Sequence, residues 1–160
     1  MHKLYIKENI NSQIFLENIL AQNNIKNYTI FKNQYGKPEL DNSQLFFNIS
    51  HDKKTTVIAL SDSPVGVDIE YLTYRQAVVN KYFTLEEQLR VLNTTDKNKT
   101  FTEIWTAKEA YVKMLGIGIE YGLQKVDTNS IKNKITYFYE EDYVIAICDK
   151  EGKHEYTVLR

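Results

Sequence analysis

Several features are scarce in this 160-residue sequence, and each scarcity excludes a class of protein. The single cysteine, Cys148, excludes an internal disulfide framework and a metal site built from thiolates. No stretch approaches the roughly 18 consecutive apolar residues of a membrane-spanning helix, and the first residues lack the apolar core of a signal peptide. We therefore expect a cytoplasmic protein with no part in a membrane.

A surplus of charge of one sign is also missing. The 20 Lys and Arg nearly balance the 21 Asp and Glu, which gives a formal net charge of −1. This balance does not favour nucleic acid or an anionic membrane as the main partner, so any phosphate site must be a local cluster. Aromatic residues, in contrast, make up 12% of the chain and include twelve tyrosines, so a sizeable core is feasible.

Hydrophobic periodicity predicts strands and helices that are segregated along the chain. Strands are expected at residues 3–7, 28–32, 45–49, 55–60, 65–71, 134–140, 143–149 and 154–159, and helices at 12–22, 75–82, 85–93 and 98–115. Ser12 is the expected N-cap of the first helix, with Ile14 on its apolar side. Segregated elements favour the α+β class over a doubly wound sheet.

A turn at Ser63-Pro64 is the boundary that we expect within the chain. It separates an N-terminal half, residues 1–63, from a C-terminal half, residues 64–160. With 160 residues, the two halves are expected to form a single compact unit.

The strand expected at residues 65–71 carries two acidic side chains on one face. Alternation along a strand puts Asp68 and Glu70 together, roughly 7 Å apart, opposite the apolar face. Gly66 is expected to leave open space beside the two acids. Two carboxylates at this spacing can hold one Mg²⁺ and leave positions for water and a substrate phosphate. The alternative is a half-exposed strand with solvated acids.

The helix expected at residues 98–115 carries a lysine inside its apolar stripe. Lys108 must therefore reach solvent or find an acidic partner. Glu109 and Lys113 lie at the edge of the stripe, one turn apart. A weak surface ion pair between these two is the alternative to a functional role.

Two further segments carry polar residues suited to phosphate or nucleotide. Phe47-Asn48-Ile49-Ser50-His51 ends a predicted strand with a hydroxyl and an imidazole at the mouth of a loop, residues 50–54. Tyr35-Gly36-Lys37-Pro38 is a predicted turn that could bring Lys37 near a nucleotide. A solvated histidine and a plain surface turn are the simpler interpretations of these segments.

Thr84 and Glu87 match a capping box at a helix start, and this structural role competes with a catalytic role for Glu87. The sequence contains no Walker loop, no G-x-G-x-x-G, no H-E-x-x-H and no calcium loop. A Ser-His-acid hydrolase is not supported, because no G-x-S-x-G elbow is present.

The order of these segments resembles the 4′-phosphopantetheinyl transferase superfamily. In chain order they are Tyr35-Gly36-Lys37-Pro38, Phe47-Asn48-Ile49-Ser50-His51, Gly66-Val67-Asp68-Ile69-Glu70, Phe83-Thr84 with Glu87, and Trp105-Thr106-Ala107-Lys108-Glu109-Ala110 with Lys113. Because the Ser-His segment precedes the G-x-D motif, the chain is similar to the surfactin-synthetase-activating type, in which two similar halves are fused around one cleft. The segment before Tyr35 is shorter than in that type. The resemblance thus implies a monomer with a pseudo-two-fold α+β fold and a trimmed N-terminal half.

The resemblance also implies an activity: transfer of the 4′-phosphopantetheine group of coenzyme A to a serine of an apo acyl, peptidyl or polyketide carrier protein, with release of adenosine 3′,5′-bisphosphate. The implied Mg²⁺ ligands are Asp68, Glu70 and Glu109. The implied contacts of coenzyme A are Lys113 at the diphosphate, Ser50 and His51 at the 3′-phosphate, and Lys37 with Pro38 beside the adenine. The candidates for handling the serine proton are Glu109, Lys108 and Glu87, and the sequence does not choose among them.

The residues leave two other functions open. A degenerate, non-catalytic relative that binds coenzyme A or a carrier protein would fit the short N-terminal half, but it would not require three acids together. A generic Mg²⁺-dependent phosphohydrolase would use the same acids, but it leaves the Ser-His segment unexplained.

Overall fold

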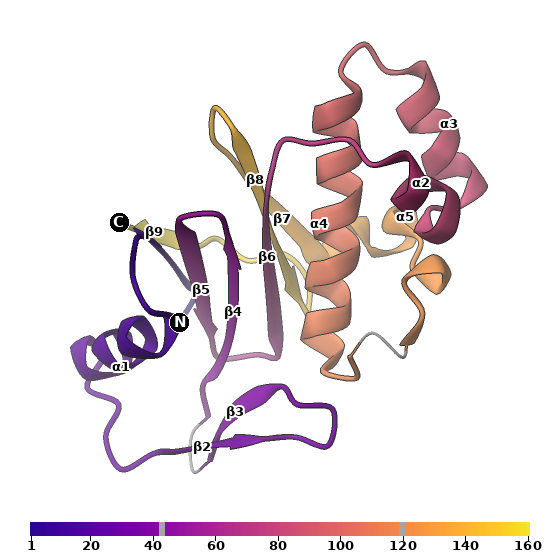
Figure 1. Cartoon of the computed structure of the whole chain (residues 1–160). Helices are drawn as coiled ribbons and strands as arrows, with labels where there is room; N and C mark the ends of the chain where they lie inside the picture. Colours follow the sequence, from indigo (N-terminus) through magenta and orange to yellow (C-terminus); the bar gives the residue numbers. More distant parts are fainter. Residues whose placement is uncertain (42–43, 119–120) are drawn as a thin grey trace.

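The computed structural model describes residues 1–41, 44–118 and 121–160, and it shows two sheets and a two-stranded ribbon packed with helices (Figure 1). The first sheet has the strand order β4-β5-β1-β9, the second has the order β6-β8-β7, and β2 pairs with β3. The strands are β1 (Lys3–Glu8), β2 (Thr29–Lys32), β3 (Pro38–Asp41), β4 (Phe46–Asp52), β5 (Thr55–Ser61), β6 (Val65–Tyr71), β7 (Ile135–Tyr139), β8 (Tyr143–Asp149) and β9 (Thr157–Leu159). The predicted α+β class is confirmed.

The helices predicted at residues 12–22, 75–82, 85–93 and 98–115 are present close to those bounds, whereas the short helix at residues 128–131 was not predicted. They are α1 (Ser12–Gln22), α2 (Gln76–Tyr82), α3 (Leu85–Asn93), α4 (Lys97–Leu115) and α5 (Thr128–Ile131), with short 3₁₀ turns at Leu123–Lys125 and Lys132–Lys134. Within the described residues, no helix is both long and apolar enough to cross a bilayer.

Helix α1 covers one face of the first sheet, with Leu16 and Ile19 buried against Ile58 of β5. The prediction of Ser12 as its N-cap is wrong by one residue. Asn11 is the cap, because its side chain accepts hydrogen bonds from the backbone N–H groups at positions 13 and 14. Ile14, expected on the apolar side, is 54% exposed.

Helix α4 lies between the second sheet and helices α2 and α3 (Figure 1). Its close approach to β6 depends on Gly66. A Cβ at that position would lie 2.0 Å from the carbonyl oxygen of Ala110 and 2.3 Å from the backbone nitrogen of Met114. The expectation that Gly66 leaves open space is therefore wrong, because the helix backbone fills that space. The missing side chain lets α4 lie directly against the strand that carries Asp68.

The opposite face of β6 is apolar, as alternation predicts, and it joins the two sheets. Its residues share one buried cluster with residues of β1, β5 and β8: Val65, Val67, Ile69 and Tyr71 with Leu4, Ile6, Val57, Ala59, Tyr143, Ile145 and Ile147. The two sheets thus bury a common core rather than two separate ones.

Strands β4 and β6 lie side by side but belong to different sheets, and side chains bridge them. The backbone N–H of Val67 donates to Asn48 Oδ1 over 2.8 Å, and that of Tyr71 donates to Asp52 Oδ2 over 2.8 Å. These bonds satisfy donors along β6 and fix its position against β4. They also set Ser50 of β4 opposite Asp68 of β6.

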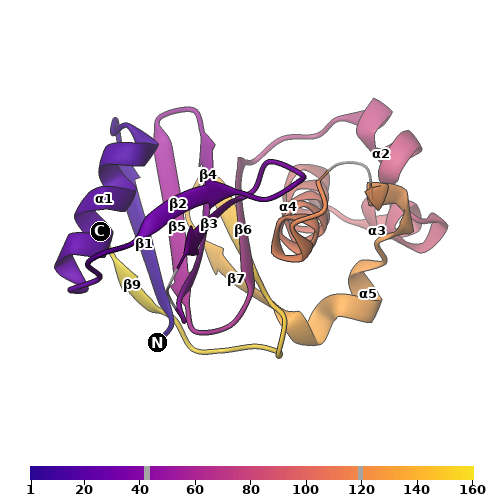
Figure 2. The same ribbon diagram turned by 90° about the horizontal axis from the view of Figure 1, so that it is seen from below.

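The chain after β8 crosses back to the first sheet, where β9 pairs with β1 in parallel (Figure 2). The strand predicted at residues 154–159 is shorter than expected, at Thr157–Leu159. The turn at Ser63-Pro64 separates β5 of the first sheet from β6 of the second sheet. The first sheet nevertheless also contains β9, which comes from the C-terminal half.

Candidate functional site

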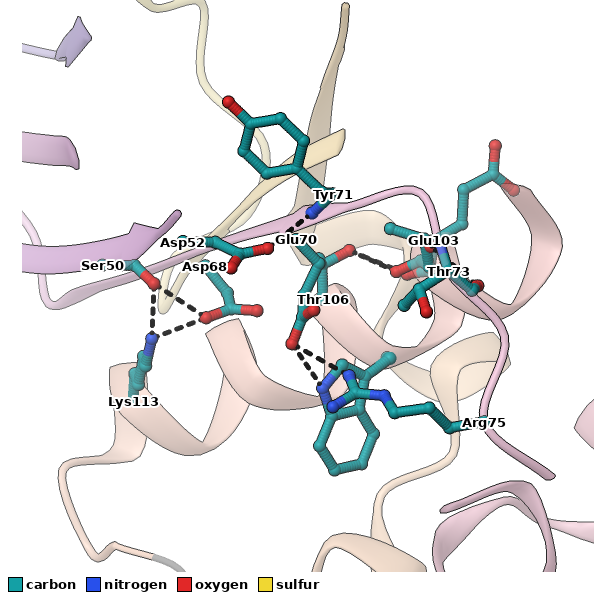
Figure 3. A network of polar contacts seen from close by, with 12 residues as sticks. Ser50, Asp52, Asp68, Glu70, Tyr71, Thr73, Arg75, Glu103, Thr106 and Lys113 are labelled. Carbon is teal, nitrogen blue, oxygen red and sulfur yellow. Dashed lines mark hydrogen bonds and ion pairs between the residues drawn. The ribbon is translucent and has the colours of Figure 1, made fainter. Parts of the chain in front are cut away.

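A closed triangle of polar groups joins β4, β6 and α4 (Figure 3). Lys113 Nζ donates to Asp68 Oδ1 over 2.6 Å and to Ser50 Oγ over 2.9 Å. Ser50 Oγ in turn donates to the same carboxylate oxygen over 2.9 Å. The predicted surface pair of Glu109 with Lys113 therefore does not form, because Lys113 turns to Asp68.

Asp68 is held in an environment that penalises its charge. Its residue exposure is 5%, and burial raises the pKa of its carboxyl, while the ammonium of Lys113 and the hydroxyl of Ser50 act in the opposite direction. Its second oxygen, Oδ2, is buried and has no hydrogen-bond partner among the described residues. A buried carboxylate oxygen without a donor is costly unless a cation completes it.

Glu70 points from β6 toward the other side of α4. Its Oε1 accepts hydrogen bonds from Trp105 Nε1 over 3.0 Å and from the guanidinium of Arg75 over 3.1 Å (Figure 3). Burial raises the pKa of Glu70, and Arg75 opposes that rise. Arg75 lies just before α2, and no motif in the sequence marked it as part of the site.

Glu109 is half-buried, and charged groups of β6 and α4 influence its carboxyl. Burial first, and then the negative charge of Asp68, raise its pKa from 4.5 to about 7, with a smaller contribution from Glu70. The three predicted metal ligands are therefore close enough to repel one another. Their oxygens do not, however, all lie within 4.8 Å of one another among the described residues.

These observations fit a hard divalent cation. Three carboxylates share one region, one oxygen of Asp68 has no partner, and the pKa of Glu109 is raised by its acidic neighbours. Mg²⁺ prefers oxygen ligands and is usually held by one or two carboxylates together with substrate phosphates. Asp68, Glu70 and Glu109 are the residues that would hold the ion, and Asp68 would then exchange its contact with Lys113 for the metal.

A cavity of about 340 Å³ opens beside this region. Its lining includes Lys37, Pro38, Asn48, Glu109, Val112, Lys113 and Gly116. Lys37 Nζ donates to the carbonyl oxygen of Val65 over 3.2 Å, and burial lowers its pKa. The turn at Tyr35–Pro38 thus lines the same cavity as Glu109 and Lys113.

His51 is not brought to this cavity. Strand β4 continues through it to Asp52, so the predicted loop at residues 50–54 contains only Lys53 and Lys54. Because neighbouring side chains on a strand face opposite ways, Ser50 points to Asp68 while His51 is exposed beside Lys53 and Thr56. The expectation that Ser50 and His51 grip the same phosphate is at odds with this arrangement.

Lys108 and Glu87 are not brought to the acidic cluster either. They form an ion pair of 2.8 Å between α4 and α3, and both side chains have 0% exposure. Lys108 Nζ also donates to the carbonyl oxygens of Leu123 and Val126, and Glu87 accepts two bonds from Thr128 as well as completing the capping box with Thr84. A closed pair with no exposed surface cannot meet a substrate hydroxyl, so its role is to hold the helices together.

Sequence comparison places these motifs among known proteins. The family model described as "4′-phosphopantetheinyl transferase superfamily" matches residues 64–158. The chain is 39% identical over 101 residues to the 4′-phosphopantetheinyl transferase gsp of Aneurinibacillus migulanus, covering 60% of this chain and 42% of that protein. It is 36% identical over 92 residues to the 4′-phosphopantetheinyl transferase psf-1 of Bacillus pumilus, covering 55% of this chain and 40% of that protein.

A longer alignment extends into the first half of the chain. The 4′-phosphopantetheinyl transferase Sfp of Bacillus subtilis (strain 168) is 26% identical over 134 residues, covering 72% of this chain and 60% of that protein. The chain therefore spans between about two fifths and three fifths of the length of these curated relatives.

Proposed function

Because the chain belongs to the 4′-phosphopantetheinyl transferase superfamily, we propose that it transfers the 4′-phosphopantetheine group of coenzyme A to a serine of an apo carrier protein. The serine oxygen forms a bond to the β-phosphorus, the bond from that phosphorus to the bridging oxygen breaks, and adenosine 3′,5′-bisphosphate leaves. The serine proton goes to a base on the enzyme. The observation that carries the proposal is the buried, unpartnered oxygen of Asp68, whose ion-pair partner Lys113 lines a cavity together with Glu109 and Lys37.

Asp68, Glu70 and Glu109 are the residues that would hold Mg²⁺. The orphaned oxygen of Asp68 and the mutual repulsion of the three acids support this assignment. When bound, Mg²⁺ supplies charge stabilisation to the diphosphate oxygens. The chain's own contribution is to bring these oxygens from a strand and a helix to one place and to exclude water from one side of them.

Lys113 is the residue that we assign to the diphosphate of coenzyme A. It lies at the border of the cavity and the acids, and its ammonium is the nearest cation to Asp68. Lys37 and Pro38 border the opposite part of the cavity, where the adenine would lie. Ser50, next to Lys113, and His51 remain proposed contacts of the 3′-phosphate, and the position of Ser50 supports its part better than the outward position of His51 does.

Glu109 is the best-placed candidate for accepting the serine proton. It is half-buried at the cavity, where a carboxylate can accept a proton from a substrate hydroxyl. Lys108 and Glu87, the other two candidates, face away in a closed pair. Negative charge that develops on the phosphate oxygens is stabilised by a preorganised cation, and Lys113 can supply that cation.

The wider expectations from the resemblance join this proposal. We propose a monomer in the cytoplasm, acting on acyl, peptidyl or polyketide carriers. A pseudo-two-fold relation of the two halves is supported by the strand–helix–strand order that both contain, with the N-terminal half trimmed. The alternative is a non-catalytic relative that binds coenzyme A or a carrier protein, and the occupation of Asp68 by Lys113 and Ser50 is the observation that favours it.

Transfer is tested by incubating the full chain with coenzyme A, MgCl₂ and a panel of apo carrier proteins, followed by intact mass spectrometry of the carrier. The expected result is the added mass of phosphopantetheine, absent when the carrier serine is replaced by alanine or when EDTA is present. Asp68→Asn keeps the shape of the side chain and should lower the transfer rate by at least about 100-fold without loss of fold. Glu17→Ala, an exposed acid on α1, is the matched control.

Two outcomes would reject the proposal. If no carrier gains mass although coenzyme A binds to the folded protein, the non-catalytic alternative replaces the transferase. If Asp68→Asn transfers at the rate of the unchanged chain, the assignment of the acids to a metal is wrong.

A further inference from the structure

A second group of potential metal ligands lies outside the site described above, where the two sheets meet. Two of the three histidines of the chain belong to it: His2, just before β1, and His154, in the segment between β8 and β9. The third member is Asp149, the last residue of β8. One ligand atom from each of the three lies within 4.8 Å of the others. The two imidazole rings stack with centroids 3.9 Å apart and an angle of 7° between their planes.

The carboxylate of this group is buried and oriented. Asp149 is 0% exposed, and the hydroxyl of Tyr156 donates to both of its oxygens, over 2.9 Å and 3.0 Å. Ser63 Oγ approaches Oδ1 at 3.4 Å. A second layer of donors that fixes a ligating carboxylate is a regular feature of protein metal sites.

The histidines are held in a comparable way. His2 Nδ1 lies 3.0 Å from Ser61 Oγ, and its other nitrogen lies 3.2 Å from Asp62 Oδ1. His154 Nε2 is buried and has no hydrogen-bond partner within the described part of the chain. A buried imidazole nitrogen without a partner is costly, and a metal ion would complete it.

We propose that His2, Asp149 and His154 bind one divalent transition-metal ion of the Zn²⁺ class. Two imidazoles and one carboxylate are the donor set that such ions prefer, whereas Mg²⁺ and Ca²⁺ prefer oxygen alone. Ligand bonds of about 2.0 Å put donor atoms roughly 3.3 Å apart in a tetrahedral site. The three side chains therefore need to close by at most about 1.5 Å from a spacing of at most 4.8 Å. Asp62 is the nearest further carboxylate and can supply a fourth oxygen.

The position of the three ligands gives the ion a structural task. It would join the start of β1 to the end of β8 and the segment leading into β9, which are distant from β1 in sequence. A closed site of this kind stabilises the folded state in proportion to the affinity for the metal. This inference does not rest on the proposed transferase activity.

Zinc binding is tested on the full, untagged chain after treatment with EDTA, in an Asp68→Ala background so that the acids of the first site do not contribute. ZnCl₂ is titrated against a chromophoric chelator, and thermal unfolding is followed in parallel. We expect one Zn²⁺ per chain with micromolar or tighter affinity, and a higher unfolding temperature with zinc. His154→Ala should weaken binding by at least about 10-fold and abolish the thermal shift.

The remaining histidine provides the matched control. His51 is exposed on β4 and is not part of this group, so His51→Ala should bind zinc as the parent does. His2→Gln is a second variant, at a position outside regular structure, in case His154→Ala does not fold. Failure of the parent to take up zinc at micromolar concentration, or unchanged affinity in both His154→Ala and His2→Gln, would overturn the proposal. Since Asp68 is absent in these proteins, neither outcome bears on the transferase.

Discussion

The contact of α4 with β6 at Gly66 leads to a sharp prediction. In Gly66→Ala the new methyl group would lie 2.0 Å from Ala110 O and 2.3 Å from Met114 N, whereas ordinary contact begins at 3.4 Å. Both opposing atoms belong to the backbone of a 19-residue helix, so no side chain can rotate away. The helix must withdraw from the strand by more than about 1 Å, and overpacking of this severity costs about 3 kcal/mol.

This loss is a large share of the roughly 5–15 kcal/mol that stabilises a small domain. It is measured by urea unfolding followed by circular dichroism, with the free energies of unfolding of the two proteins compared. Withdrawal of α4 would also carry Glu109 and Lys113 away from the acids of β6, so the transfer rate should fall in parallel. A destabilisation below about 1 kcal/mol with an unchanged rate would refute the argument.

A double variant distinguishes this mechanism from simple crowding of side chains. Ala110→Gly removes the only side-chain atom of that residue but leaves its carbonyl oxygen in place. Since the predicted clash is with backbone atoms, Gly66→Ala combined with Ala110→Gly should be no more stable than Gly66→Ala alone. Recovery of stability in the double variant would show that the clash involves the side chain instead.

Two further predictions concern charged groups. Lys108→Met leaves Glu87 buried without its cation, so the free energy of unfolding should drop by about 3–5 kcal/mol, and Lys108→Met with Glu87→Gln should recover part of it in the same urea assay. In EDTA, the pKa of Glu109 is raised from 4.5 to about 7 in the folded state, which therefore binds this proton more tightly than the unfolded state does. The free energy of unfolding should thus fall as pH rises through this range, and Glu109→Gln should flatten that slope in unfolding titrations at several pH values.

Most elements could be predicted from the sequence because their signals are local, although β3 and α5 were not predicted. The capping box of Thr84 with Glu87 marks the start of α3, and strict alternation marks β6. The need of Lys108 for an acidic partner could also be predicted from its place in an apolar stripe, since a buried charge must be compensated. The identity of this partner, Glu87, could not be predicted, because it depends on how α3 packs against α4.

The site itself was predicted only in outline. The assignment of Asp68, Glu70 and Glu109 to one metal came from the family resemblance and stays a prediction, whereas the hydrogen-bond partners of Asp68 and Glu70 depend on packing between elements. Ser50 meets Asp68 because β4 continues to Asp52 and lies beside β6. No local sequence pattern encodes this pairing of strands. Arg75 reaches Glu70 from the segment before α2, and nothing in its sequence neighbours indicates that contact.

The parallel pairing of β9 with β1 has a consequence for the order of assembly. Strands β1, β4 and β5 all precede the second sheet in the chain and pair antiparallel, whereas Thr157–Leu159 emerges from the ribosome only after the whole second sheet. Until then, one side of β1 offers unpaired backbone groups to any other extended chain. A nascent chain that stalls before this strand would thus expose an unpaired sheet edge, which favours aggregation or chaperone binding.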